Sequence, residues 1–305
     1  MRNQFISSLV DQAKADENIF LLVGDLGYGV VEPFVDLFPE RFINLGVAEQ
    51  NMLSVAAGIA SEGARVFVYS IANFPTFRAA EQIRNDVDYH NLPVTIVTVG
   101  GGLSYGNLGY SHHAIQDYGL MRLFPNMEIL APGCPQEVKS CMNYIQTSSS
   151  PSYLRLAKAG EPVICNESNL AGGQIYLQND LGESCARLLL TTGNNIKLVL
   201  DAVREGGLLN QWNIATLPVW GMKYKDFLRQ QLAPYQTIVT VEDHIADGGF
   251  GSYVREASDF NQQIDTIHLN AESVGAVGDE SYLRELGGVN SQSIIDKLLR
   301  HQKSK

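Results

Sequence analysis

The segment FINLGVAEQNMLSVAAGIASEGARVFV, residues 42–68, has the pattern of a strand, a helix and the beginning of a second strand. The first strand ends at a turn near Gly46, an alanine-rich helical pattern follows, and Gly63 ends that pattern. Such a unit predicts two parallel strands with a helix packed across them. Glu49 lies at the start of the helix, where a carboxylate interacts favourably with the helix dipole.

The same alternation of apolar strand runs and helical patterns extends in both directions. It continues from NIFLLVGDL to PSYLRLA, and it restarts from ARLLLTTG to SQSIIDKLLRHQ. The intervening stretch AGEPVICNESNLAGGQ carries turn residues and little periodicity. We therefore predict an α/β fold of two domains, each with a mainly parallel sheet covered by helices. The predicted bounds are 1–165 for the first domain, 166–180 for the linker and 181–305 for the second domain.

Composition limits the classes of function. The 305 residues carry a net charge of −11 without a Lys/Arg-rich run, which argues against nucleic-acid binding. No apolar run approaches the roughly 18 residues of a membrane span, and the N-terminus lacks a signal pattern. We therefore expect a cytoplasmic protein. The chain has four cysteines without C-x-x-C spacing, Cys134, Cys141, Cys165 and Cys185. They are predicted to be buried free thiols.

Ligands of open parallel sheets bind beyond the carboxyl ends of the strands. Asp25, Glu49 and the glycine-rich loop 100–113 are predicted to lie there. His112 and His113 end this loop and suit hydrogen bonding or acid–base chemistry near neutral pH. A solvent-facing helix start is the alternative for this pair. No second Cys/His pair with ligand spacing is present, so zinc is not indicated.

Two other stretches have a structural and a functional interpretation. Phe74 and Phe77 share one helical face, which is typical of core packing or of a wall for a flat heterocycle. The stretch VEDHIADGGFGSYV has glycines after a strand, but it lacks the Walker lysine and the G-x-G-x-x-G spacing. It is predicted to be a tight strand-to-helix turn.

Five segments, taken together, resemble the carboxyl-terminal two thirds of transketolase, a family that depends on thiamine diphosphate. In order, they are GVAEQNM, ANFPTFRAAEQIR, YSHHAIQDYGLMRLFPNM, PSYLRLAKAG and TIVTVEDHIADGGFGS. The resemblance covers nearly the whole chain, as a pyrimidine-binding domain followed by a transketolase C-terminal domain. It implies an enzyme that transfers a two-carbon ketol unit between sugars or sugar derivatives.

The resemblance implies roles for the residues of the first domain. The glutamate that matches Glu49 hydrogen-bonds the aminopyrimidine ring of the cofactor, so that this ring can take the proton of the thiazolium carbon. Phe74 matches an aromatic residue that packs on the pyrimidine, and Phe77 is expected to join it. Ile71 stands where the family often has a further aromatic residue. Asp25 aligns with an acid near the cofactor.

The resemblance also implies substrate contacts. His112 matches a histidine that contacts substrate hydroxyls, and together with Glu49 it is the expected catalytic residue. His113 stands in the place of a common glutamine. Lys158 aligns with an arginine that holds the sugar phosphate. Lysine keeps the positive charge but cannot form the two parallel hydrogen bonds of a guanidinium. Arg2 aligns with a second phosphate-binding arginine.

Two departures concern the recognition of hydroxyl groups. Leu108 stands where the family usually has an aspartate, four residues before His112, and Gly100 stands where it has a histidine. A site without these polar groups discriminates less well for a polyhydroxylated ketose phosphate. We therefore hypothesise a non-standard substrate, such as a deoxy, branched or nucleotide-linked sugar.

No segment matches the diphosphate- and metal-binding motif of the family. The resemblance therefore implies a separate partner chain that carries this domain, with thiamine diphosphate shared between the chains and Mg²⁺ or Ca²⁺ held mainly by the partner. An α2β2-like assembly with self-association is expected. The rivals are the β subunit of a 2-oxo-acid dehydrogenase, an acyloin-forming pyruvate-using synthase, a 1-deoxyxylulose-5-phosphate synthase and a non-catalytic regulatory subunit.

Overall fold

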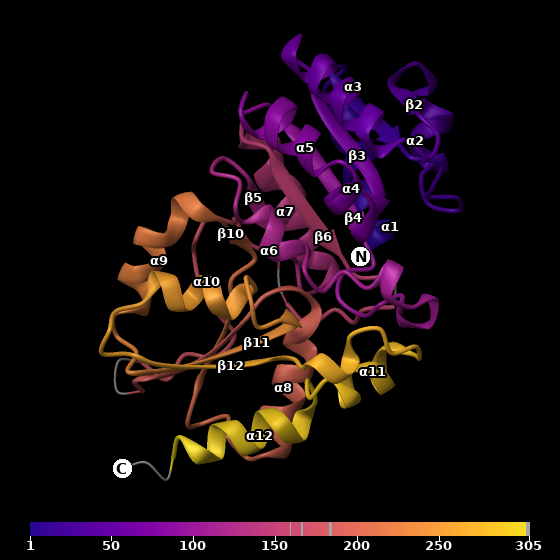
Figure 1. The fold of residues 1–305 in the computed structure, drawn as a ribbon. Coiled ribbons are helices and arrows are strands. Elements are labelled where there is room, and N and C mark those ends of the chain that lie inside the picture. The colour runs from indigo at the N-terminus through magenta and orange to yellow at the C-terminus, as the bar shows by residue number, and fades with distance from the viewer. Residues whose placement is uncertain (159, 166, 183–184, 303–305) are drawn as a thin grey trace.

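The computed structural model describes residues 1–302 except 159, 166, 183 and 184. Two sheets organise these residues, one in each half of the chain (Figure 1). The predicted α/β fold is confirmed: within each sheet the long strands run parallel and helices cover both faces. Among the described residues, no helix is long and apolar enough to cross a membrane.

The first sheet has seven strands in the order β10-β5-β6-β4-β3-β1-β2. They are β1 (Ile19–Val23), β2 (Phe42–Asn44), β3 (Arg65–Ile71), β4 (Val94–Val99), β5 (Glu128–Leu130), β6 (Ser152–Leu156) and β10 (Val219–Trp220). Successive side chains of β3 point to opposite faces, as the pleat requires. Phe67 and Tyr69 belong to one apolar cluster, and Val66 and Val68 belong to the other.

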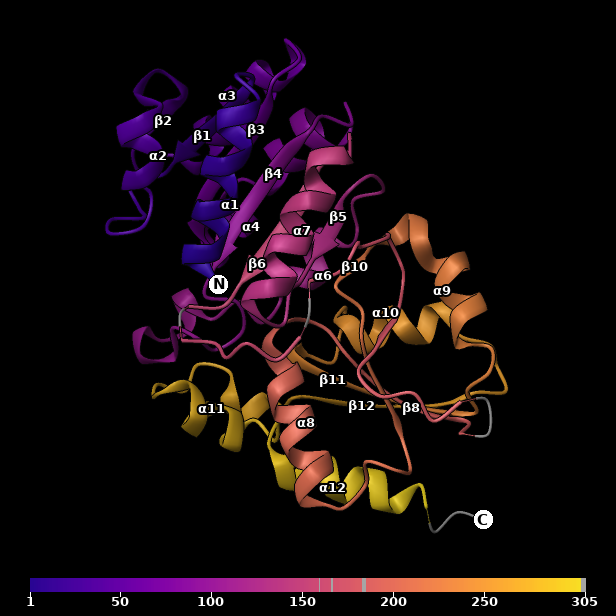
Figure 2. The same cartoon turned by 180° about the vertical axis from the view of Figure 1, so that it is seen from behind.

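Helices cover both faces of the first sheet. One face carries α1 and α7, with α2 beside α1, and Figure 2 shows α7 along this face. The other face carries α3 and the helical run α4–α5–η2, followed by α6. The bounds are α1 (Arg2–Ala15), α2 (Glu32–Leu37), α3 (Glu49–Ser61), α4 (Asn73–Arg78), α5 (Ala80–Gln82), the π-helical turn η2 (Ile83–Asp88), α6 (Asp117–Met121) and α7 (Pro135–Thr147).

The second sheet has the strand order β12-β11-β8-β9-β7. Its strands are β7 (Tyr176–Leu177), β8 (Arg187–Thr191), β9 (Asn213–Thr216), β11 (Thr237–Ile245) and β12 (Gln263–Leu269). Side by side, α8 and α12 cover one face, and α9 and α10 cover the other (Figures 1 and 2). The helices are α8 (Ile196–Glu205), α9 (Lys225–Leu232), α10 (Phe250–Ala257), α11 (Glu280–Leu286) and α12 (Ser291–Arg300).

The remaining elements are short 3₁₀ turns at loops and helix starts. They are η1 (Pro39–Arg41), η3 (Gly106–Leu108), η4 (Tyr110–His112), η5 (Gly193–Asn195), η6 (Met222–Tyr224) and η7 (Ala271–Ser273). The turn predicted after β11 is also present. There the Glu242 carboxylate accepts the backbone N–H groups of Phe250 and Gly251 at the start of α10, at 2.5 and 3.0 Å. Burial raises the pKa of Glu242 to about 8, against the lowering effect of these two hydrogen bonds.

One strand of the second half of the chain joins the first sheet, and the predicted linker adds a strand to the second sheet. Within 166–180, where a linker is predicted, β7 pairs antiparallel with β9 of the second sheet. From the second half, β10 pairs antiparallel with β5 of the first sheet. The single strand expected for WNIATLPVW is thus two strands, because Pro218 lacks the N–H that would continue the ladder. Trp220 then packs on Tyr118 and Phe250, with ring centroids 5.1 and 5.4 Å apart.

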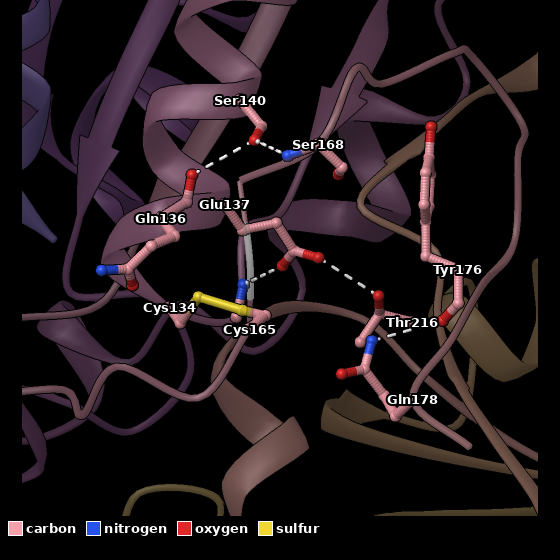
Figure 3. The surroundings of a disulfide bond; sticks show 10 residues. Cys134, Gln136, Glu137, Ser140, Cys165, Ser168, Tyr176, Gln178 and Thr216 are labelled. Carbon is pink, nitrogen blue, oxygen red and sulfur yellow. Dashed lines mark hydrogen bonds between the residues drawn. A yellow bond between two sulfur atoms is a disulfide. The ribbon is translucent and has the colours of Figure 1, made fainter.

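The expectation of four free thiols is wrong. Cys134, which precedes α7, is bonded to Cys165 in the segment after β6 (Figure 3). Cys141 is a buried free thiol and Cys185 a half-buried one. The pair is 31 residues apart in the sequence, and only the return of the chain alongside α7 brings it together. The Ser168 N–H also donates to Ser140 Oγ of α7 at 3.0 Å.

Loss of this bond is expected to destabilise the protein. For a loop of this length, replacing Cys165 by Ser should lower the free energy of unfolding by roughly 3–4 kcal/mol, because the unfolded chain gains freedom. Urea denaturation without reductant measures the change. Cys185→Ser is the matched control and should differ little. Equal stability of wild type with and without dithiothreitol would contradict this expectation.

Candidate active site

Glu49 is the first residue of α3, at the carboxyl edge of the first sheet. The turn before it depends on Asn44, whose Oδ1 accepts the N–H groups of Gly46 and Asp25, each at 3.0 Å. Gly46 has a φ of 72°, which glycine adopts without a steric cost. This turn brings the Glu49 side chain into the protein, where it is only 4% exposed. A helix-dipole role alone does not require such burial.

Arg78 contacts Glu49 directly. Its Nη1 lies 2.7 Å from Glu49 Oε1, and its guanidinium carbon lies 4.1 Å above the centre of the Phe74 ring. Phe74 and Arg78 are four residues apart on α4, so they share one face of this helix. The buried carboxylate is therefore paired with a flat cation stacked on an aromatic ring.

His112 completes this group. Its ring lies edge-on to Phe74, with centroids 5.1 Å apart, and its Nδ1 lies 3.0 Å from Ser111 Oγ. Asn73 holds the backbone of this turn by donating to the Ser111 carbonyl at 3.0 Å. Desolvation lowers the pKa of His112 below its usual value, and the electrostatic effects of His113 and Arg78 lower it further. The imidazole is therefore neutral at neutral pH and can exchange hydrogen bonds with hydroxyl groups.

Tyr105 explains why residue 100 is glycine. A Cβ on Gly100 would lie 2.1 Å from the Tyr105 ring, and Gly100 has a φ of 81°. Lys158 Nζ lies 5.2 Å from the centre of the same ring. Burial raises the pKa of Tyr105, while the charge of Arg2 and its hydrogen bond to Tyr105 act in the opposite direction. Tyr105 thus lies close to both cations, Arg2 and Lys158.

Four other expected residues lie outside this group of contacts. Phe77 and Leu108 are exposed, at 48% and 51%, and Ile71 ends β3 with partial exposure. His113 faces the protein interior, with Nε2 3.4 Å from the Gly106 carbonyl oxygen and no exposed surface. His113 thus has no surface that a substrate could contact in this structure, which corrects that expectation, whereas the adjacent His112 at the end of the 3₁₀ turn is partly exposed.

Asp25 lies at the same sheet edge but is bonded within its own turn. Its carboxylate accepts from Tyr28 Oη at 2.7 Å and from Asn44 Nδ2 at 3.1 Å. These two hydrogen bonds lower the pKa of Asp25, and the one from Tyr28 has the larger effect. Asp25 adopts a φ of 56°, which is uncommon outside glycine. It is therefore a charged group near the site whose hydrogen bonds hold this turn.

A buried ion cluster supports the loop from behind. Arg155 Nε lies 2.7 Å from Asp117 Oδ2, Nη1 lies 2.7 Å from Asp243 Oδ1, and Nη2 donates to the Ala114 carbonyl at 2.7 Å. Ala114 pairs with Gly102 in an isolated bridge, so Arg155 also holds the beginning and end of the loop 100–113. This cluster joins the two halves of the chain, because Asp243 belongs to β11.

Residues 1–160, which contain every residue of this site, match the family described as the transketolase pyrimidine binding domain. The chain belongs to the transketolase family. This confirms the family resemblance seen in the five sequence segments. The match ends near the predicted end of the first domain, although the predicted domain bounds remain a prediction.

Relatives of similar length extend the match to the whole chain. A protein of Methanocaldococcus jannaschii named for the C-terminal section of transketolase is 32% identical over 99% of this chain and 96% of its own. One of the subunits of the apulose-4-phosphate transketolase of Actinobacillus succinogenes is 29% identical over 98% of this chain and 97% of its own. The solved structure of a split gene transketolase, an inactive beta4 tetramer, has a TM-score of 0.84 at 26% identity, covering 98% and 97%.

Longer members of the family are matched over part of their length. The 1-deoxy-D-xylulose-5-phosphate synthase of Clostridium kluyveri is 27% identical over 97% of this chain but only 47% of its own. The transketolase of Leishmania mexicana has a TM-score of 0.82 at 17% identity, a likeness of fold, over 46% of its chain. This chain therefore corresponds to about half of these longer proteins.

Sequence reasoning missed three residues that organise the site: Arg78, Tyr105 and Arg155. Arg78 lies in the segment ANFPTFRAAEQIR, four residues after Phe74, and this spacing on a helix was the available signal. Tyr105 follows the triple glycine closely enough to fold back on it. Arg155 interrupts the apolar run PSYLRLA, and a charge within a buried strand indicates an ion pair.

Proposed function

We propose that this chain is the β-type subunit of a two-chain, thiamine diphosphate-dependent, transketolase-like enzyme. The enzyme transfers a two-carbon ketol unit between sugars or sugar derivatives and needs a partner chain that carries the diphosphate- and metal-binding domain. The observation that carries the proposal is the buried Glu49 carboxylate beside the Phe74 ring and the neutral His112 imidazole. Relatives named as one subunit of a transketolase and as a split gene transketolase support the two-chain arrangement.

The residues fit the ring end of the cofactor. Glu49 offers a carboxylate away from bulk water, which can share a proton with a ring nitrogen, and Phe74 offers an aromatic face for a flat heterocycle. When bound, thiamine diphosphate supplies the carbon nucleophile and electron sink of the reaction. Glu49 then holds the ring proton, Phe74 orients the ring, and His112 hydrogen-bonds a hydroxyl of the substrate.

The phosphate of the sugar is assigned to the cations around Tyr105. Lys158 follows the end of β6 and Arg2 begins α1, and both bring a positive charge close to Tyr105. An anionic group binds favourably between such charges, although lysine contributes a point charge and not a bidentate fork. The Tyr105 ring lies edge-on to His112, with ring centroids 6.4 Å apart, so the proposed phosphate position lies close to the proposed hydroxyl contact.

The partner chain is proposed to cover the exposed side of the site. Four large apolar side chains near the site residues in the sequence are exposed, and a partner chain could cover them. They are Val47, Phe77, Leu108 and Tyr110. An α2β2 assembly, with Mg²⁺ or Ca²⁺ held mainly by the partner chain, completes the proposal.

Leu108 and Gly100 are the basis of the proposed substrate preference. Leu108 presents an apolar surface where the family presents a carboxylate, and the space at Gly100 is filled by Tyr105. Neither residue can hydrogen-bond a sugar hydroxyl through its side chain. The preferred donor or acceptor should therefore lack, or present differently, the hydroxyls that these positions normally recognise.

The assembled enzyme is expected to use xylulose 5-phosphate and ribose 5-phosphate poorly. Leu108→Asp should raise kcat/KM for this pair by roughly tenfold, because a charged hydrogen bond to a hydroxyl is restored. A coupled steady-state assay measures the change, with Leu123→Asp, an exposed leucine of another surface, as the control. Wild-type kcat/KM at or above about 10⁵ M⁻¹s⁻¹ for this pair would contradict the substrate proposal.

An assay of the same assembled enzyme distinguishes ketol transfer from the pyruvate-using alternative. The similarity to 1-deoxy-D-xylulose-5-phosphate synthases is the reason to test this alternative. Ketol transfer should release no CO₂, whereas a 2-oxo acid donor loses CO₂ in each turnover. Incubation with carboxyl-labelled pyruvate and a sugar phosphate acceptor is expected to release no label. Release of label at the rate of product formation would replace the ketol-transfer proposal with a decarboxylating one. Apulose 4-phosphate, named in a relative, belongs among the substrates tested.

A further inference from the structure

We infer that Arg78 is a latch, which occupies the proposed pyrimidine site of this subunit and must move out before thiamine diphosphate binds. The inference rests on the proposed function and goes beyond it, because it assigns a competing side chain to that site. Arg78 makes both of the contacts that the cofactor ring would need: a hydrogen bond to Glu49 Oε1 at 2.7 Å, and a stacking contact with Phe74 at 4.1 Å.

The chemistry of the two groups is similar enough for direct competition. A guanidinium is planar, donates N–H groups in its plane and stacks on aromatic rings. An aminopyrimidine is also planar, offers a proton to a carboxylate and stacks in the same way. One face of Phe74 and one oxygen of Glu49 cannot serve both groups at once. Binding of the ring therefore requires Arg78 to leave.

The position of Arg78 allows this movement. It is the last residue of α4, and α5 begins at Ala80, so it lies at a break in the helical run. Its side chain is 46% exposed, whereas that of Glu49 is 4% exposed. The cation can therefore turn into solvent without leaving a buried charge of its own. Glu49 cannot leave, because it is fixed at the first turn of α3.

In the subunit without cofactor, Arg78 also stabilises the site. Burying the charged carboxylate of Glu49 costs free energy unless a cation or hydrogen-bond donor pairs with it. Arg78 pairs Glu49 until the cofactor ring replaces it, which keeps the site ordered and balances the charge of the carboxylate. Arg78 is thus a residue that acts on the cofactor through Glu49 and Phe74, and it is distinct from the residues assigned to hold the cofactor.

The test is the affinity of the assembled two-chain enzyme for thiamine diphosphate in saturating Mg²⁺, measured by calorimetry. Arg78→Gln removes the cation and is expected to lower the Kd roughly five- to tenfold, the worth of a partly exposed ion pair. Arg78→Lys keeps the charge without the flat stacking group and should lie between Arg78→Gln and wild type. Arg84→Gln, at an exposed arginine that donates to its neighbour Asn85, is the matched control and should leave Kd unchanged.

A double-mutant cycle shows whether the effect acts through Glu49. In an enzyme that carries Glu49→Gln, adding Arg78→Gln should change Kd by less than about twofold, because the competing ion pair is already absent. A higher or unchanged Kd for Arg78→Gln alone would overturn the latch, and so would an equal effect in both backgrounds. An assembled wild type that binds no thiamine diphosphate would overturn the proposed function, and the latch with it.

Discussion

Replacing Glu49 by Gln is expected to reduce turnover of the assembled enzyme by roughly 10²–10⁴-fold. Glutamine preserves the size of the side chain but cannot share a proton with a ring nitrogen as a carboxylate can. Because Glu49 is buried at the start of α3, water cannot easily replace it. The loss should appear in kcat at saturating cofactor and substrate, since the missing interaction serves the reaction and not only binding.

The matched control is Glu62→Gln, at the other end of the same helix. Glu62 is exposed and follows the last residue of α3, so its replacement should leave kcat within about twofold of wild type. Steady-state kinetics of both variants, prepared with the same partner chain, provide the comparison. Full activity of Glu49→Gln would overturn the catalytic interpretation and favour a subunit that kept the fold for a regulatory role.

Replacing Arg155 by Met is expected to lower the free energy of unfolding by about 3–5 kcal/mol. Arg155 is buried between Asp117 and Asp243, each 2.7 Å away, and its guanidinium carbon lies 4.2 Å from the centre of the Tyr118 ring. Removing the cation leaves two buried carboxylates without their main partner. Urea denaturation measures the loss. Arg229→Met, which breaks an exposed pair with Asp226, should cost less than about 1 kcal/mol.

The sign of the pH dependence separates this mechanism from simple loss of packing. Burial raises the pKa of Asp243, but Arg155 and Arg284 lower it more, so its pKa is below the usual value. In wild type, Asp243 therefore contributes stability above the ordinary aspartate range and loses it as the pH falls. Without Arg155, less positive charge opposes the effect of burial on Asp243, so protonation of this carboxylate becomes less costly. The deficit of Arg155→Met should shrink toward low pH, and a deficit independent of pH would contradict an electrostatic origin.

Local pattern was enough to predict the unit that carries Glu49. The strand, turn and helix read from residues 42–68 are present as β2, the Gly46 turn and α3, because each depends on periodicity and on one glycine. The position of Glu49 at a strand's carboxyl edge followed from the same pattern. Phe74 of α4 and His112 of the loop 100–113 are in ring contact, while the roles that the family resemblance implies for them stay predictions.

Contacts between distant segments could not be predicted in this way. The bond between Cys134 and Cys165, and the pairing of β10 with β5, both depend on how the chain returns across the first sheet. Arg78 and Glu49 are 29 residues apart in the sequence, and only the folded chain brings their opposite charges into contact. The different burial of the adjacent residues His112 and His113 was also not predictable, because it depends on how a short 3₁₀ turn packs in the folded chain.

The central claim is that this chain supplies half of a thiamine diphosphate site. Calorimetric titration of thiamine diphosphate and Mg²⁺ into the chain alone, into a candidate partner carrying the diphosphate domain, and into their mixture tests it most directly. We predict saturable binding at micromolar concentrations only for the mixture, together with ketol transfer. Equally tight binding and turnover by the chain alone would contradict the claim.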